Sequence, residues 1–74
     1  MSPVPSFLVR YHGPRDEQVI GALARHGIAY VPDDRSADLQ TFQVLAGSRR
    51  EAAERVSLAL DRQGVAYGTL AIEG

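Results

Sequence analysis

Cysteine and lysine are both absent from this chain of 74 residues. Without cysteine the chain has no disulfide, no thiolate nucleophile and no cysteine ligands for zinc or iron–sulfur clusters. Without lysine it supports neither Schiff-base catalysis nor a phosphate-binding P-loop. Stability must therefore come from packing, and we predict a protein that holds neither a metal nor a cofactor.

Charge is nearly balanced, since eight arginines stand against nine acidic side chains and the formal net charge is -1. This balance argues against the strongly basic surface that is typical of nucleic-acid binding. No apolar run is long enough to span a membrane, and residues 1–7 lack the charged start of a signal peptide. We therefore expect a cytoplasmic protein.

The length allows a single domain over residues 1–74. A domain of this size buries about 60% of the surface of its unfolded chain, so its own core gives marginal stability. A partner surface would add to that stability. We therefore expect the chain to self-associate.

The chain resembles itself at an offset of 37 residues, because residues 17–30 align with residues 54–67. Both segments end in the pattern Gly-aliphatic-Ala-Tyr, at 27–30 and 64–67. Two copies of one unit, about 6–37 and 38–74, explain this pattern, and such units must pack on each other to close a core. Chance similarity between two alanine-rich helices is the alternative.

The first half is predicted to contain a strand, a helix and a second strand. Residues 6–11 are rich in β-forming residues. Pro14 suits the first position of a helix, so we expect the helix over 14–26, closed by Gly27. A short strand over 28–31 and a polar hairpin loop over 33–38 follow.

The second half repeats this order. Apolar residues over 39–46 follow the period of two that is typical of a strand. Ser48 and Glu51 have the spacing of a capping box, which starts a helix, and Gly64 supplies its left-handed end. Glu51 and Arg55 are expected to form an ion pair on the exposed side of that helix. The last strand is expected over 65–73, with a bulge at Gly68.

The resulting order is βαββαβ. Right-handed crossovers place both helices on one face of a four-stranded antiparallel sheet, with the first and third strands central. We therefore predict the α+β fold known as the ferredoxin-like sandwich. This architecture leaves the second face of the sheet open.

We predict a homodimer formed through the open sheet faces or the edge strands, because a mixed apolar surface on a small domain often marks a protein contact. Tyr30 and Tyr67 are equivalent in the repeat and are expected on the edge strands, where they would line an edge-to-edge interface. Packing of these tyrosines against the helix ends is the alternative. Isolated surface leucines without a partner are the alternative. The candidate interface residues are Leu8, Thr41, Gln43, Leu45, Tyr30 and Tyr67.

The Gly13-Pro14 loop after the first strand, and the His26-Gly27-Ile28 segment after the first helix, resemble those of ACT and ACT-like regulatory domains. The resemblance spans nearly the whole chain and is specific mainly to the fold. In that family the loop holds a small ligand with backbone amides at a dimer interface. The resemblance therefore implies self-association and a regulatory role. A domain of this size also commonly works beside a larger protein, so a larger protein partner is considered as well.

The same loop is also a candidate site for a small anion or carboxylate. Its residues would be Arg10, His12, Gly13 and Arg15, because basic side chains here lie close to the positive end of the first helix. An ordinary turn between strand and helix is the alternative. No catalytic residue is assigned.

Three functions thus remain open. The favoured one is a non-catalytic, self-associating module that binds a protein or a small ligand. A small enzyme or enzyme subunit that uses Arg10 and His12 in a cleft of the open face is the first alternative. An RNA-binding module that stacks bases on Phe7, Tyr11 and Phe42 is the second, although the basic residues of RNA recognition motifs are missing from the third strand.

Overall fold

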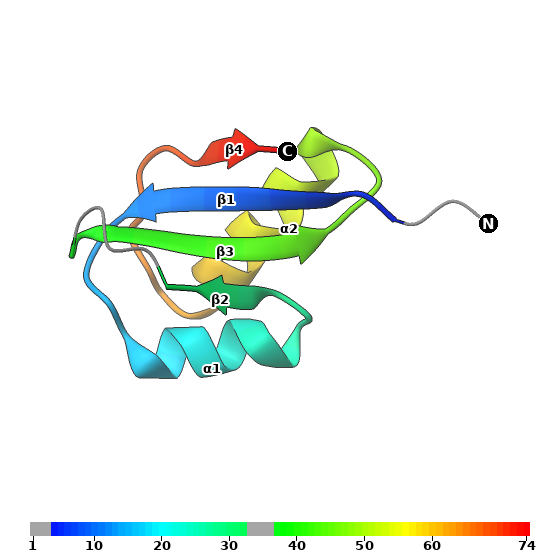
Figure 1. Ribbon diagram of the computed structural model, residues 1–74. Coiled ribbons are helices and arrows are strands. Elements are labelled where there is room, and N and C mark those ends of the chain that lie inside the picture. Colours follow the sequence, from blue (N-terminus) through cyan, green and yellow to red (C-terminus); the bar gives the residue numbers. More distant parts are fainter. Residues whose placement is uncertain (1–3, 33–36) are drawn as a thin grey trace.

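The computed structural model describes residues 4–32 and 37–74 (Figure 1). Its elements are β1 (Ser6–His12), α1 (Glu17–Arg25), β2 (Ala29–Val31), β3 (Leu39–Leu45), α2 (Arg49–Arg62) and β4 (Ala71–Glu73). The predicted βαββαβ order is confirmed. Positions 33–36 of the predicted hairpin loop lie outside the described residues.

The strands form one antiparallel sheet in the order β2-β3-β1-β4. The seven-residue strands β1 and β3 are central, and the three-residue strands β2 and β4 are at the edges. Figure 1 shows α2 behind the sheet and α1 beside β2, and α1 also packs against α2. This is the predicted ferredoxin-like α+β arrangement.

The core lies between the two helices and one face of the sheet. Side chains alternate along a strand, so every second residue of β1 and β3 points into this core. The register places Val9 beside Phe42, whose ring is fully buried. The ring of Phe42 stacks on Tyr11 at a centroid distance of 6.0 Å and meets Tyr30 edge-on at 5.5 Å. The helices contribute Val19, Ala22, Leu23, Ala52, Val56, Ala59 and Leu60.

Both helices end in the same hydrogen-bonded turn. Gly27 follows α1 with a φ of 77°, and Gly64 follows α2 with a φ of 70°. The residue after each glycine donates its amide to the carbonyl of the last leucine of the helix, at 2.9 Å in α1 and 3.1 Å in α2. These bonds define a Schellman motif, which needs a residue in the left-handed conformation. The predicted left-handed end at Gly64 is confirmed.

The start of α2 contains most of the predicted capping box. The hydroxyl of Ser48 accepts the amide of Glu51 at 3.1 Å. The carboxylate of Glu51 reaches one residue further back than expected and accepts the amide of Gly47 at 3.0 Å. Because Glu51 is held there, it does not form the predicted ion pair with Arg55, which donates to two backbone carbonyls of other elements instead.

The start of α1 differs from the prediction. The helix begins at Glu17, whereas the position of Pro14 favoured an earlier start. Asp16 is the cap, because its backbone is extended and its side chain accepts the amide of Gln18 at 2.9 Å. A capping carboxylate satisfies one of the unpaired amides at a helix start and fixes the boundary there.

The last strand is much shorter than predicted, since it covers Ala71–Glu73 and not 65–73. These three residues pair with Leu8, Val9 and Arg10 of β1. Residues 65–70 lead from the end of α2 to that edge without a strand partner. Gly68, the predicted bulge, has a φ of 66° in this connection. Strand-forming residues do not make a strand where no neighbouring backbone is available to pair with them.

Two glycines in and after α1 should respond in opposite ways to alanine. Replacement of Gly27 forces alanine into the left-handed conformation, so Gly27→Ala should lower the free energy of unfolding by about 1–2 kcal/mol. Gly21 lies inside the helix, and a methyl group there would meet no heavy atom within 4 Å beyond the helix's own backbone. Gly21→Ala should therefore raise the free energy of unfolding by about 0.5–1 kcal/mol. Urea denaturation measures both, and changes of the same sign would contradict the assignment.

Candidate functional site

The open face of the sheet carries the side chains that point away from the helices. Leu8 of β1 lies opposite Gln43 of β3, and Arg10 lies opposite Thr41. The edge strands add residues to the same face. Glu73 of β4 lies beside Leu8, and Ala29 of β2 lies beside Gln43. The other described residues on this face are Ser6, His12, Val31, Leu39, Leu45 and Ala71.

Exposed apolar surface is concentrated at the end where β1 begins and β3 ends. Leu45 is 52% exposed there, and Leu8 is partly exposed. Val4, just before β1, is 59% exposed, and the polar Gln43 is also exposed. Leu8, Gln43 and Leu45 are called the apolar end of the open face below, and Val4 lies in the segment that leads into β1. Three of the predicted interface residues thus lie together.

The other half of the open face is less accessible. Thr41, a predicted interface residue, is only 1% exposed. The side chain of Arg10 is 12% exposed and forms an ion pair with Glu73 across the β1–β4 edge. The charges of Arg10 and Glu73 cancel, and the other described residues of the open face are uncharged when His12 is neutral. This face therefore carries no net formal charge.

The two tyrosines predicted at the interface lie away from the apolar end. Tyr30 belongs to β2 and faces the core, where it contacts Phe42. Tyr67 precedes β4, and its hydroxyl lies 2.8 Å from the hydroxyl of Ser57 on α2. The structure therefore groups them with the helices and not with Leu8 and Leu45.

Gly13, the centre of the predicted anion site, has both backbone polar groups occupied. Its amide donates to the carbonyl of Asp38 at 2.7 Å. Its carbonyl accepts from the side-chain amide of Gln40, which is 2% exposed, at 3.0 Å. These bonds fasten the loop after β1 to the start of β3. A loop amide used in this way does not point at a ligand.

The basic side chains of the predicted anion site point toward opposite edges of the sheet. Arg10 pairs with Glu73 on β4. Arg15 pairs with Glu17 at 2.8 Å, and its guanidinium lies 5.3 Å from the ring centroid of Tyr30 on β2. His12 is exposed at the end of β1. The structure does not gather these residues around one point.

The aromatic residues considered for base stacking face the core. Phe7, Tyr11 and Phe42 are 9%, 3% and 0% exposed. Burial, assisted by the negative charge of Asp16 and by Tyr30, raises the pKa of Tyr11. Its hydroxyl therefore stays protonated to higher pH than that of an exposed tyrosine. None of the three rings presents a face on which a nucleic-acid base can stack.

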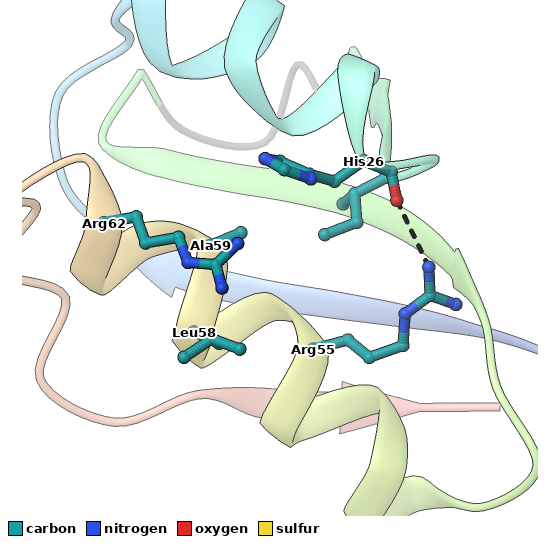
Figure 2. A pocket seen from close by; sticks show the side chains of 6 residues that line it. His26, Arg55, Leu58, Ala59 and Arg62 are labelled. Atoms are coloured by element: carbon teal, nitrogen blue, oxygen red, sulfur yellow. Dashed lines mark hydrogen bonds between the residues drawn. The ribbon is translucent and has the colours of Figure 1, made fainter.

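A cavity of about 160 Å³ lies between the end of α1 and the side of α2 (Figure 2). Its lining residues are His26, Ile28, Arg55, Leu58, Ala59 and Arg62. This site was not predicted from the sequence, because the Arg55 side of the second helix was assigned to solvent and the end of the first helix was given no partner. The spacing of Arg55, Leu58 and Arg62, three and four residues apart, is the signal that places them on one helix face.

Within residues 4–32 and 37–74, no group of three or more histidine, aspartate or glutamate side chains is placed to hold a metal ion. No helix in this described part of the chain has the length and hydropathy needed to cross a bilayer.

Comparisons with known proteins found no match to a family model, to a curated protein or to a solved structure. Function is therefore argued from the surfaces of the molecule.

Proposed function

We propose that this protein is a non-catalytic module that pairs with a second copy of itself through the open face of its sheet. The observation that carries the proposal is the apolar end, where Leu45 is more than half exposed and the register places it one pair away from the partly exposed Leu8. Among the described residues Leu45 is one of three large apolar side chains left this exposed, and another, Val4, lies just before β1. Burial of such a group of apolar side chains against a partner is favourable because it removes apolar surface from water.

A second copy suits this face electrostatically. In a two-fold dimer the same patch meets itself, so any excess charge on it would be repelled. The described residues of the open face instead hold one internal ion pair, Arg10 with Glu73, and no excess charge. The edge strands are only three residues long, which favours contact through the face over pairing through the edges.

The area of the open face limits the expected affinity of the dimer. Strands about 4.8 Å wide and about 3.3 Å per residue, with seven residues in each central strand and three in each edge strand, give a face of roughly 300 Å². This is smaller than the roughly 800 Å² that each partner buries in a standard interface. We therefore expect a reversible dimer with a dissociation constant in the micromolar range.

The finer part of the proposal is a regulatory role, which the ACT-like resemblance implies, and a location in the cytoplasm, which the sequence analysis expects. The βαββαβ topology and the exposed sheet face are consistent with it. The ligand of such a module would bind outside the loop after β1, because the Gly13 amide is bonded to Asp38. The enzyme alternative needs Arg10 as an active-site cation, whereas its side chain is paired with Glu73 at the sheet edge.

Sedimentation velocity over a concentration series tests the proposal. The expected result is a concentration-dependent change from the monomer mass of 8.0 kDa to twice that value. A constant monomer mass up to high micromolar concentration would overturn it. Intermolecular nuclear Overhauser contacts from Leu8 and Leu45 in a mixed-labelled sample would place the interface on the open face.

A further inference from the structure

The cavity between the helices carries three nitrogen-bearing side chains and no carboxylate. His26 comes from the end of α1, and Arg55 and Arg62 come from α2. Figure 2 shows the two arginines on either side of Leu58 and Ala59, with His26 opposite them. Two guanidinium groups and an imidazole therefore surround the space from three directions.

Arg55 is held in place by the protein. Its guanidinium donates to the carbonyl of His26 at 3.2 Å and to the carbonyl of Leu45 at the end of β3. These bonds link three elements and fix the orientation of a planar group that has five N–H donors. The N–H groups of this guanidinium that do not bond these carbonyls are left to donate to a ligand. A side chain that is already ordered loses less conformational freedom when a ligand binds.

The other two basic groups have no partner within the described part of the chain. Over residues 4–32 and 37–74, neither the guanidinium of Arg62 nor the imidazole of His26 makes a hydrogen bond or an ion pair. Glu51 lies one helical turn before Arg55, and its carboxylate is bonded to the amide of Gly47. The positive charge of the cavity is thus not neutralised by acidic residues of its lining.

The wall of the cavity beneath these groups is apolar. Ile28 and Ala59 are 1% and 6% exposed, and Leu58 forms part of the rim. His26, Leu58 and Arg62 are exposed, so a bound anion would meet the apolar wall on one side and solvent on the other. A volume of about 160 Å³ is close to the roughly 150 Å³ that accommodates a benzene-sized ligand.

We propose that this cavity binds a compact oxyanion of the phosphate class, either inorganic phosphate or the phosphate group of a small metabolite. Basic groups on three sides suit a tetrahedral anion, whose oxygens point in several directions, better than a planar carboxylate. The site lies among the helices, opposite the open face of the sheet, so it does not depend on the proposed dimer.

The test is a nuclear magnetic resonance titration of the isotope-labelled protein with sodium phosphate, against sodium chloride at the same ionic strength and pH. Phosphate should shift the amide signals of the cavity residues saturably, and chloride should not. Arg62→Ala should weaken the phosphate affinity at least about tenfold, because a hydrogen bond to a charged group is lost. Phenyl phosphate should compete with inorganic phosphate if the site accepts a metabolite.

Arg25→Ala is the matched control. Arg25 occupies the last turn of α1, as Arg62 does in α2, and it is exposed and does not line the cavity. It should change the phosphate affinity by less than about twofold, since screened surface charges outside the contact contribute little. Equal losses in the two variants, the same shifts with chloride, or tighter binding of acetate than of phosphate would overturn the proposal. Phosphate binding that persists in a monomeric Leu8→Asp variant, which changes no residue that lines the cavity or holds Arg55, separates this site from the dimer.

Discussion

Leu45→Asp should convert the protein to a monomer at concentrations where the unchanged chain is a dimer. In the proposed interface the new carboxylate would be buried against apolar side chains of the second copy. An uncompensated buried charge costs several kcal/mol, and each 1.4 kcal/mol is a tenfold change in affinity. The dissociation constant should therefore rise by about a hundredfold or more. Sedimentation velocity and size-exclusion chromatography with light scattering measure the change.

Leu58→Asp is the control for this prediction. Leu58 is 54% exposed, almost the same as the 52% of Leu45, but it lies on α2 on the opposite side of the sheet. Both substitutions replace a half-exposed leucine, so both variants should fold. Loss of the dimer in both would indicate a general effect of added charge and would count against the open face as the interface.

Phe42→Ala should remove a large part of the free energy of unfolding. The ring of Phe42 is fully buried and contacts two other aromatic rings, those of Tyr11 and Tyr30. Truncation of a buried phenylalanine costs about 3–5 kcal/mol. A domain of this length has a total stability of roughly 4–11 kcal/mol. Urea denaturation followed by circular dichroism, at a concentration where the protein is monomeric, gives the loss directly.

Tyr30→Phe is the companion variant. It keeps the ring that meets Phe42 edge-on and removes only a hydroxyl, so stability should change by less than about 0.5 kcal/mol. A loss below about 1 kcal/mol in Phe42→Ala would mean that the aromatic cluster does not organise the core. A large loss in Tyr30→Phe would place the stabilisation in the hydroxyl and not in ring packing.

The order of elements could be predicted because its signals are local. Gly27 and Gly64 mark helix ends through backbone geometry that few other residues adopt. The alternation in β3 predicted which side of the strand is buried, and Phe42 and Val44 confirm it. Signals of this kind need no knowledge of which segment lies beside them.

The features that were predicted wrongly depend on partners distant in sequence. Residues 65–70 have strand-forming side chains, but the free edge of β1 is reached only at Ala71. Glu51 and Arg55 have the spacing of an ion pair, but a loop amide and two distant carbonyls bind them instead. Side-chain propensity and spacing do not rank such competing partners.

The same limitation applies to the candidate sites. The open face follows from topology, so Leu8 and Leu45 could be placed on it from the sequence. The burial of Thr41 and the Arg10–Glu73 pair depend on side-chain positions across three strands. The cavity between the helices requires the packing of α1 on α2, which no periodicity within either helix specifies.

The short β4 determines which part of the sheet can detach most easily. The three residues of β4 cover the outer edge of β1, with the Arg10–Glu73 ion pair and one hydrogen bond from Arg49 to the carbonyl of Ile72 at 2.7 Å. Few bonds break when such a strand leaves, so its amides should exchange with solvent well before those of β1 and β3. Each departure uncovers a backbone edge at which an extended segment of another chain can add as a new strand.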